Sequence, residues 1–330
     1  MGAGELERLL SDLAGEHPPD QKPSFNRWLD FGRFDLGENV LVSNVDIILP
    51  MVLSPADFGE IAVAHVLSDI YAAGATPLFA LNILGIAQGI SSDDEDIVGM
   101  LRSASKKLEA HDVALVGGHT MGDQGDFYYG LSVTGIIGKE RLVTNDGARK
   151  GDVLVLTKPL GTSVATVSWK RNPQHYDKFE DVLAGMKQSN DIASSEMFAH
   201  GATACTDITG FGFLGHTHNL LKASNASAVI RSAKVPVYES VKPYIYEECG
   251  TTRMWGKNFD YVKDYVEFSV TFSPLLEITL FDAQVSGGLL VCLPPSNADA
   301  FTSSLRAKGV DATIVGEITE GDPGHIEIVV

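Results

Sequence analysis

Residues 43–77 read SNVDIILPMVLSPADFGEIAVAHVLSDIYAAGATP, and this stretch predicts a strand, a turn and a long helix in succession. The strand ends at Pro50, a Ser-Pro pair then begins the helix, and the helix runs for about four turns to Gly74. Two carboxylates, those of Asp46 and Asp69, lie within otherwise apolar segments at the two ends of the stretch. An ionised carboxylate among Val, Ile, Leu and Ala is costly, so each one requires a cation or dense hydrogen bonding nearby.

The composition is that of an ordinary globular protein. Its 330 residues suit one large or two medium domains, and 44% of them are hydrophobic and 21% charged. A formal net charge of −18 argues against nucleic acid or an anionic membrane surface as a partner. A nucleotide substrate stays compatible, since bound metal offsets phosphate charge locally. No apolar run approaches the length of a membrane span, so we expect no transmembrane helix.

The cysteines bear on the compartment. Cys205, Cys249 and Cys292 include no C-x-x-C pair. An odd number of cysteines without such a pair argues against a disulfide framework or a zinc site. It favours the reducing cytoplasm.

The chain divides into a short N-terminal segment and two longer halves. Residues 1–23 are typical of an acidic amphipathic helix followed by a linker, and not of a signal peptide. A Gly-Asp turn before a new apolar strand predicts a boundary near residue 150. The expected domains are therefore residues 24–150 and 151–330.

Strands and helices alternate in both halves. In the first half we expect paired strands within 31–48, buried strands at 77–89 and 113–120, a strand at 127–138, and a helix capped by Ser91 or Ser92. In the second half we expect helices at 179–202 and 296–308, a glycine-punctuated turn opening a helix at 204–224, an irregular aromatic segment at 250–280, and strands at 228–231, 285–295, 311–317 and 325–330. This alternation predicts two α/β domains.

Four isolated aspartates stand in apolar or glycine-rich settings: Asp30, Asp46, Asp69 and Asp207. Mg²⁺ takes oxygen ligands, often one or two carboxylates together with phosphate oxygens and water, so the four are candidate metal ligands. Two simpler explanations stay open. Asp69 could face solvent or cap a neighbouring segment, although a buried position inside a helix is disfavoured for aspartate. Asp207 could simply begin a helix.

A glycine pair marks a second candidate site, because Gly117-Gly118-His119 ends a strand that we expect to be buried. Glycine lets a ligand approach the backbone, and bare N–H groups suit a phosphate or a purine edge. The pair matches neither the dinucleotide fingerprint nor the P-loop, and a simple turn is the alternative. His119 is a ligand, a base or a hydrogen-bonded structural histidine.

Three further polar residues are candidates for a binding role. Lys158 follows an apolar strand and faces either a phosphate or, more commonly for such a turn residue, the solvent. His216 and His218 lie two positions apart on a helix and do not share a face, so we expect no metal bound by these two together.

Seven segments, taken together, resemble the selenophosphate synthetase family in its eukaryotic-like form. They lie in order between about residues 30 and 295 and read LVSNVDIILPMV, ADFGEIAVAHVLSDIYAAGATPLFALNIL, ALVGGHT, LSVTGII, GDVLVLTKPLGT, ATACTDITGFGFLGH and QVSGGLLVCLPP. The combination of TDITGFG with TKPLGT separates the chain from two sister families, aminoimidazole ribonucleotide synthetase and thiamine-monophosphate kinase. The resemblance implies the two-domain aminoimidazole ribonucleotide synthetase-like α/β fold, with mixed sheets flanked by helices.

The resemblance also implies an activity. Members of the family make selenophosphate from selenide, ATP and water, releasing AMP and phosphate for selenocysteine biosynthesis. They use Mg²⁺, often with K⁺ nearby, and form homodimers through their N-terminal sheets. Position by position, the resemblance implies metal binding by Asp30, Asp69 and Asp207, and nucleotide binding by Asp46, Asp69, Gly117, Gly118 and His119.

The chain departs from the family pattern near its start. The family has a Gly-rich N-terminal motif with a nucleophilic Cys or selenocysteine and then an essential Lys, whereas here no Cys precedes Cys205 and the first Lys is Lys22. We therefore assign no catalytic residue and expect little selenophosphate from this polypeptide, which is either truncated after the motif or a paralog that lost it. Two other functions stay open: a non-catalytic regulatory paralog, and a sister-family ATP enzyme acting on another small molecule.

Overall fold

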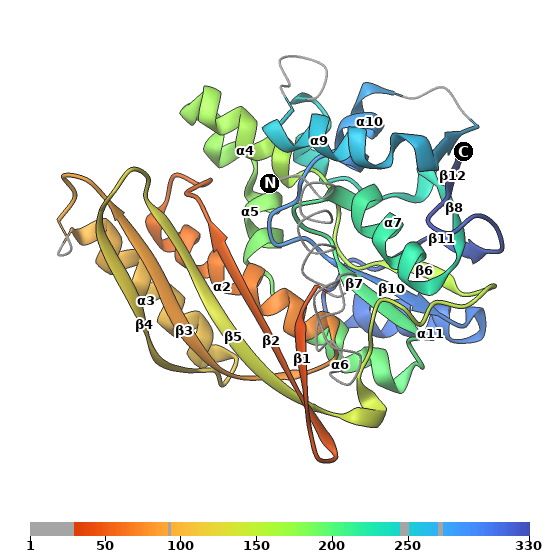
Figure 1. Ribbon diagram of the computed structural model, residues 1–330. Helices are drawn as coiled ribbons and strands as arrows, with labels where there is room; N and C mark the ends of the chain where they lie inside the picture. Colours follow the sequence, from red (N-terminus) through yellow and green to blue (C-terminus); the bar gives the residue numbers. More distant parts are fainter. Residues whose placement is uncertain (1–29, 92–93, 245–250, 270–272) are drawn as a thin grey trace, which may run out of the picture.

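The computed structural model describes residues 30–330 except 92–93, 245–250 and 270–272. The helix and linker expected within residues 1–23 lie outside the described residues. Figure 1 shows two β-sheets, one formed by the first half of the chain and the other by the second half, with helices packed against both. β5 ends at Gly138 and β6 begins at Val153, so we keep residue 150 as the proposed division between two domains.

The first sheet has five strands in the order β1-β2-β5-β3-β4. The strands are β1 (Gly32–Leu36), β2 (Asn39–Ile48), β3 (Thr76–Ala87), β4 (Ala114–Gln124) and β5 (Tyr128–Gly138). Neighbouring strands are antiparallel except β3 and β4, which are parallel. The strands expected within 31–48 and at 77–89 and 127–138 are confirmed, but the strand at 77–89 is buried on one face only, because Leu78, Phe79 and Leu81 are exposed.

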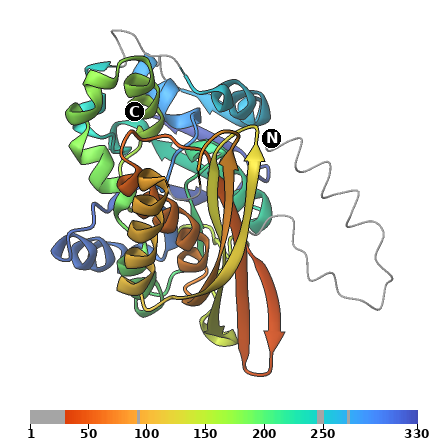
Figure 2. The same ribbon diagram turned by 90° about the vertical axis from the view of Figure 1, so that its left-hand side faces the viewer.

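Two helices, α2 (Pro55–Ala72) and α3 (Glu95–Ala110), cover one face of this sheet. Figure 2 shows both on the same side, and among the described residues no helix covers the opposite face, which we call the helix-free face. Ser54 caps α2 by accepting from the Asp57 N–H at 3.2 Å, and Gly74 ends it with φ of 71°. With 18 residues α2 has about five turns, one more than expected.

The second sheet has seven strands in the order β7-β10-β6-β11-β8-β12-β9. The strands are β6 (Val153–Leu156), β7 (Ala204–Asp207), β8 (Ser227–Arg231), β9 (Val266–Phe268), β10 (Leu289–Leu293), β11 (Thr313–Thr319) and β12 (Ile326–Val329). Only the pairs that β12 makes with β8 and β9 are parallel. Both sheets are thus mixed, as expected.

Helices surround the second sheet (Figure 1). They are α4 (Thr162–Arg171), α5 (Glu180–Lys187), α6 (Asp191–Ala199), α7 (Gly212–Ser224), α9 (Arg253–Val262), α10 (Pro274–Phe281) and α11 (Pro295–Ala307). Short 3₁₀ turns are η1 (Lys139–Arg141), η2 (Pro173–Lys178), η3 (Ser232–Lys234), η4 (Glu239–Val241) and η5 (Lys263–Tyr265). The strands expected at 228–231, 285–295, 311–317 and 325–330 are confirmed, as is the helix at 296–308.

Three expectations for the first half and its continuation were wrong. Asp94, not Ser91 or Ser92, caps α3, because its carboxylate accepts from the Asp96 N–H at 2.9 Å. β4 is an edge strand that runs on through the glycine pair, so residues 114–120 are exposed rather than buried. The helix expected over 179–202 is two helices, because Gln188 is extended and its carbonyl accepts from Lys158.

The segment 250–280 is not irregular, because its described residues contain α9, β9 and α10. Each helix begins at a hydroxyl cap, Thr252 for α9 and Ser273 for α10, which the aromatic composition obscured. Trp255 and Phe259, four positions apart on α9, stack with ring centroids 5.3 Å apart. Within 204–224 the turn and helix are confirmed, but the strand β7 that precedes them was missed.

One hydrophobic core extends across both halves of the chain and fixes how they pack. We call the contact between the halves the seam, and the candidate site lies there. The core joins side chains of α2 and the first sheet to α4 and α5. Trp169 of α4 is fully buried, and its indole N–H donates to the Met51 carbonyl oxygen at 2.5 Å. Because α2 packs on the first sheet, on α3 and on the second half, it is apolar on nearly every side.

Candidate active site

The sequence-predicted aspartates Asp30, Asp46, Asp69 and Asp207 converge at the seam, and we call them the carboxylate cluster. Asp46 lies on β2, Asp69 on α2 and Asp207 at the end of β7, while Asp30 lies two positions before the start of β1. Charges on Asp30, Asp46 and Asp207 all act on Asp69, which places the four within one electrostatic neighbourhood. Both halves of the chain therefore contribute to the cluster.

Asp69 is a buried carboxylate, with 8% of the residue exposed. The Asn44 side-chain amide donates to Asp69 Oδ2 at 2.9 Å and to the Val66 carbonyl oxygen at 2.9 Å. Asn44 and Asp46 lie two positions apart on β2, so both side chains point to the face that packs against α2. A neutral amide thus holds Asp69 without neutralising it, and the explanation that Asp69 faces solvent is excluded.

Burial is the main cause of the raised pKa values of Asp30, Asp69 and Asp207. Burial and then the Asp207 and Asp46 charges raise the pKa of Asp69 well above its usual range. Burial, with Asp30 adding to it, raises the pKa of Asp207 to about 8. Burial also raises the pKa of Asp30 to about 6, although the Thr206 hydrogen bond opposes this. Carboxylates pressed together in this way are stabilised by a bound cation.

A group of possible metal ligands lies at the second-half side of the cluster. Ligand atoms of Asp30, Asp207 and His216 lie within 4.8 Å of one another, and Asp207 Oδ1 is buried with no hydrogen-bond partner among the described residues. An orphaned carboxylate oxygen beside a second carboxylate fits a hard cation such as Mg²⁺. The donor set therefore accommodates the metal that the resemblance implies.

His216 joins the site through hydrogen bonds, and the sequence analysis missed this role. Burial lowers the pKa of His216 to about 3, so its imidazole is neutral. Because the Phe211 N–H donates to His216 Nε2 at 3.4 Å, we assign the ring proton to Nδ1, which lies 3.5 Å from Thr206 Oγ1. Thr206 in turn donates to Asp30 Oδ2 at 2.6 Å. The sequence signal that could have revealed this role was the position of His216 shortly after Asp207 in the TDITGFGFLGH segment.

A second set of hydrogen bonds holds α2 against the glycine-rich segment before β10. The Ser286 N–H donates to His65 Nδ1 at 3.1 Å. The Asn190 side-chain amide donates to Ser68 Oγ and to the Gly287 carbonyl oxygen, both at 2.9 Å. These contacts fix the position of α2, and with it Asp69, relative to the second sheet.

Lys158 is buried, so the expectation of a solvated turn residue was wrong. Only 3% of the residue is exposed, and Nζ donates to the Gln188 and Ser286 carbonyl oxygens at 2.6 and 2.9 Å. Burial lowers the pKa of Lys158 to about 7. The ammonium group of Lys158 therefore donates to two backbone carbonyl oxygens, and not to the phosphate or solvent expected from the sequence.

The glycine pair and His119 lie on β4, away from the carboxylate cluster. Asp46 pairs with Leu131, Leu131 with Asn82, and Asn82 with Gly118, so a row of residues crosses the sheet from the cluster to the pair. Three strand spacings amount to about 14 Å. Gly118 has φ of 157°, and a Cβ there would lie 2.3 Å from the Asn82 carbonyl oxygen. Glycine is required at this position, while His119 is exposed.

Two of the three cysteines are described, and neither provides a nucleophile. Cys205 and Cys292 are buried free thiols on neighbouring strands. Burial raises the pKa of both well above the ordinary value, so the reactive thiolate is disfavoured. Among the described residues, every helix is too short or too polar to span a bilayer.

The chain is similar along most of its length to known protein families. Residues 30–137 match the family model described as AIR synthase related protein, N-terminal domain, and residues 149–329 match the corresponding C-terminal domain. A selenide, water dikinase of Pelobacter propionicus (strain DSM 2379 / NBRC 103807 / OttBd1) is 35% identical over 325 residues, covering 97% of this chain and 92% of that protein. One from Myxococcus xanthus (strain DK1622) is 34% identical over 328 residues, covering 98% and 92%.

Solved structures with the same fold are more distant in sequence. AaThiL complexed with AMPPCP and TMP has a TM-score of 0.75 at 19% identity, covering 99% of this chain and 93% of that one. Hydrogenase maturation protein HypE in complex with ATP has a TM-score of 0.68 at 21% identity, covering 97% and 90%. These likenesses confirm the expected two-part α/β fold with mixed sheets.

Proposed function

The chain belongs to the selenide, water dikinase family of AIR synthase related proteins, and on this premise we propose that its site binds ATP with Mg²⁺ for the synthesis of selenophosphate. The observation that carries the proposal is the carboxylate cluster, in which Asp69 and Asp207 approach from opposite halves of the chain and share a buried space. Selenide and water are the other substrates, with AMP and phosphate as the products.

The metal ligands in this proposal are Asp30, Asp69 and Asp207, with Asp46 facing the metal and triphosphate. When bound, Mg²⁺ offsets negative charge on the phosphate oxygens. Asn44 orients the Asp69 carboxylate, and Thr206 orients that of Asp30. The lone Asp207 Oδ1 is free to ligate. The family resemblance extends the proposal to K⁺, for which we assign no ligand.

In this proposal the nucleotide spans the interval from the carboxylate cluster to Gly118 and passes around the residues between them, because Leu131 in that row is fully buried. The interval of about 14 Å is the length scale of an extended nucleoside triphosphate. Gly117 and Gly118, both with positive φ, bring bare backbone close to the ligand, and the exposed His119 is available to donate a hydrogen bond. This placement keeps all five sequence-predicted nucleotide residues, at two ends of one ligand.

Activation of selenide is a separate requirement. The described cysteines, Cys205 and Cys292, are buried in the second sheet and unsuited to it. We therefore propose that this polypeptide binds ATP and Mg²⁺ but forms little selenophosphate. A non-catalytic regulatory paralog, which is the alternative function, would behave in the same way. The sequence's cysteine usage supports the cytoplasm as the place of action.

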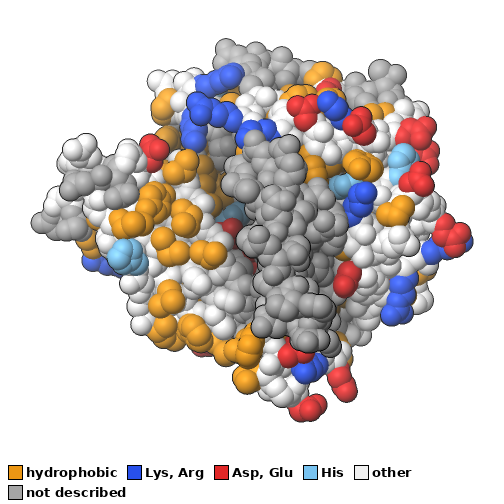
Figure 3. Space-filling model, in the orientation of Figure 1, with side chains coloured by type: hydrophobic (Ala, Val, Ile, Leu, Met, Phe, Trp, Pro, Cys, Tyr) orange, Lys and Arg blue, Asp and Glu red, His pale blue; other side chains and the backbone are white. Residues whose placement is uncertain are grey.

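A homodimer is also proposed, formed through the helix-free face of the first sheet. Val45 and Ile47 on this face are 58% and 50% exposed, and Leu81 lies in the same row as Val45 through their shared partner Ser132. Figure 3 shows hydrophobic side chains gathered over this sheet. A contiguous apolar face of this kind is typical of a subunit interface.

One assay separates the candidate functions. The polypeptide is incubated with ATP, Mg²⁺ and selenide, and ³¹P NMR follows selenophosphate, AMP and phosphate. Our proposal expects ATP binding by calorimetry with little selenophosphate. Turnover of an aminoimidazole ribonucleotide precursor or of thiamine phosphate would instead establish the sister-family alternative. Absence of any Mg²⁺-dependent ATP binding, in wild type under conditions where the fold is intact, would reject the proposed site.

A further inference from the structure

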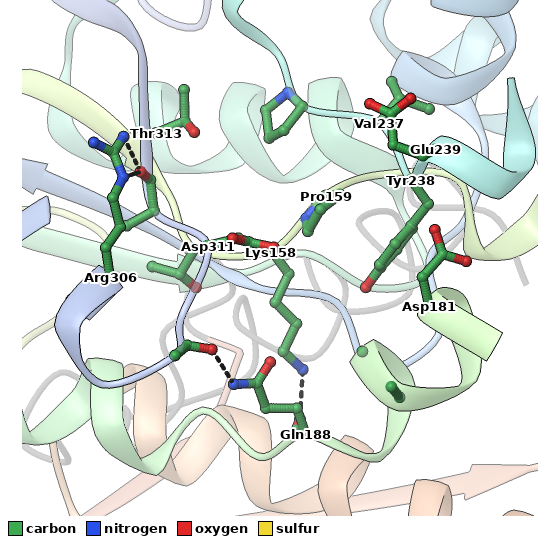
Figure 4. A pocket seen from close by; sticks show the side chains of 16 residues that line it. Lys158, Pro159, Asp181, Gln188, Val237, Tyr238, Glu239, Arg306, Asp311 and Thr313 are labelled. Atoms are coloured by element: carbon green, nitrogen blue, oxygen red, sulfur yellow. Dashed lines mark hydrogen bonds between the residues drawn. The ribbon is translucent and has the colours of Figure 1, made fainter.

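A second cavity lies in the second half of the chain, away from the carboxylate cluster. Its volume is about 730 Å³. Four parts of the chain line it: Lys158 and Pro159, which follow β6; α5; the segment before η4; and the connection from α11 to β11. Figure 4 shows its lining residues. Neither the family resemblance nor the similar proteins reported above suggest a role for this cavity.

Tyr238 is the central polar group of the cavity. The residue is 6% exposed, and its hydroxyl has no hydrogen-bond partner among the described residues. In Figure 4 the ring reaches from the cavity wall and directs the hydroxyl inward, with Asp181 beside it. A Cβ on Gly185 would lie 2.0 Å from this hydroxyl oxygen, so glycine makes the room that the tyrosine needs. A hydroxyl that has no partner in the protein and opens into a cavity is available to accept a hydrogen bond from a ligand.

The charges around Tyr238 favour a cation. Asp181 and Asp311 both act on Tyr238 electrostatically, and burial together with these carboxylates raises the pKa of the tyrosine above its usual value. The Asp311 carboxylate makes no hydrogen bond or ion pair within the described part of the chain, so it remains free to accept. Glu239 adds a third carboxylate to the cavity wall.

The cations of the wall are already engaged. Lys158 donates to two carbonyl oxygens and, in Figure 4, turns its ammonium toward Gln188. Arg306 donates through Nε and Nη2 to the Ala312 carbonyl oxygen, at 2.9 and 2.6 Å. Asp181 accepts from Ser240, and Glu239 pairs with Lys242, so the Tyr238 hydroxyl and the Asp311 carboxylate are the acceptors of the wall without a partner among the described residues.

A bare metal ion fits less well than an organic cation. Among the described residues, ligand atoms of three acidic or histidine side chains converge only at Asp30, Asp207 and His216, so the carboxylates of this cavity do not come together around one point. Pro159, Pro236 and Val237 supply apolar wall between the polar groups. A molecule with an apolar stem and an ammonium group matches both features.

We propose that this cavity binds a small organic cation whose primary ammonium group lies between the Tyr238 hydroxyl and the Asp311 carboxylate. The ammonium donates to the tyrosine oxygen and to the carboxylate, and the carbon chain packs on the prolines. The site is independent of the proposed ATP chemistry, because none of its residues belongs to the carboxylate cluster.

Isothermal titration calorimetry of the whole polypeptide with putrescine tests the proposal, with the butanediol of equal length as a neutral probe. We expect putrescine to bind with a dissociation constant below about 1 mM and the diol to give no heat. Tyr238→Phe and Asp311→Asn should each weaken putrescine binding about tenfold, since each removes an acceptor for a charged donor. Glu320→Gln, which alters an exposed carboxylate paired with Lys150 outside the cavity, should leave binding unchanged.

The opposite results are equally clear. Absence of putrescine binding up to about 10 mM, equal binding of the diol, or wild-type affinity in both cavity variants would overturn the proposal. If circular dichroism shows that Tyr238→Phe is unfolded, Asp311→Asn decides the matter, because Asp311 is exposed and its replacement leaves the core intact.

Discussion

Thr206 Oγ1 donates a 2.6 Å hydrogen bond to Asp30 Oδ2, joining two residues that are 176 positions apart in the sequence. His216 Nδ1 lies on the other side of the threonine hydroxyl, at 3.5 Å. This connection ties the start of the first sheet to the end of β7, so the geometry of the carboxylate cluster depends on how the two halves pack.

Replacing Thr206 by valine keeps the shape and removes this hydrogen bond. Because the bond lowers the pKa of Asp30, its loss should raise that pKa further and make the carboxylate harder to ionise. We expect the apparent affinity for Mg²⁺–ATP at neutral pH to fall about threefold to tenfold, measured by calorimetry. Thr206→Ser retains the hydroxyl and should bind as wild type does, and equal affinities in all three proteins would contradict the role.

Asp207→Asn removes one of the mutually repelling carboxylates while keeping its shape. In the absence of metal we expect the variant to gain at least about 1 kcal/mol of unfolding free energy at pH 8, since the buried charge is lost. The same change should abolish the stabilisation that MgCl₂ gives to wild type in thermal melts. Asp299→Asn, at an exposed position of α11, is the matched control. A destabilised Asp207→Asn protein that still responds to Mg²⁺ would refute the metal site.

The pH dependence follows from the raised pKa values of Asp207, about 8, and Asp30, about 6. A carboxyl group whose pKa is higher in the folded state contributes stability below the unfolded pKa and loses it as pH rises through the folded value. The contribution of these groups to metal-free stability should therefore decline between about pH 4 and pH 8, while Mg²⁺ binding strengthens from about pH 6 to pH 8. Melting curves with and without MgCl₂ should diverge as pH rises; parallel curves would exclude this linkage.

The helix-free face of the first sheet predicts a dimer that charge can disrupt. Introducing lysine at both Val45 and Leu81 should shift the protein from the mass of two chains to that of one in light scattering after gel filtration, because the buried ammonium groups have no partners. Val98→Lys alters an exposed apolar residue on α3, outside this face, and should leave the mass unchanged. A wild-type monomer would exclude the proposed interface.

Trp169 tests the packing that aligns the two halves. Trp169→Ala should lower the free energy of unfolding by about 3–5 kcal/mol in urea titrations, because a fully buried side chain is replaced by a cavity. Trp169→Phe keeps most of the ring but loses the hydrogen bond to the Met51 carbonyl oxygen, and we expect about 1–2 kcal/mol. Losses below about 1 kcal/mol in both variants would show that this contact does not hold the seam.

Local patterns in the sequence were sufficient for much of the fold. Alternation of apolar residues predicted β2, β3 and β5, and the Ser-Pro start with the glycine stop predicted α2, because such signals depend only on neighbouring residues. The cost of placing Asp46 and Asp69 in apolar segments was also visible locally, and the structure buries Asp69 but leaves Asp46 half-buried. Local patterns failed where a residue distant in the sequence determined the structure. One predicted helix is two helices, because Lys158 donates to the carbonyl oxygen of Gln188, which lies between them.

By itself, the sequence determined the fold class, the two-part organisation and which aspartates require compensation, since these follow from propensity, periodicity and the chemistry of each side chain. Tertiary structure alone decided that Thr206, His216 and Asn44 support those aspartates, that Lys158 is buried, and that the glycine pair lies across the sheet from the cluster. The physical reason is that burial and hydrogen bonding at the seam depend on packing between segments far apart in the chain, which no local pattern contains.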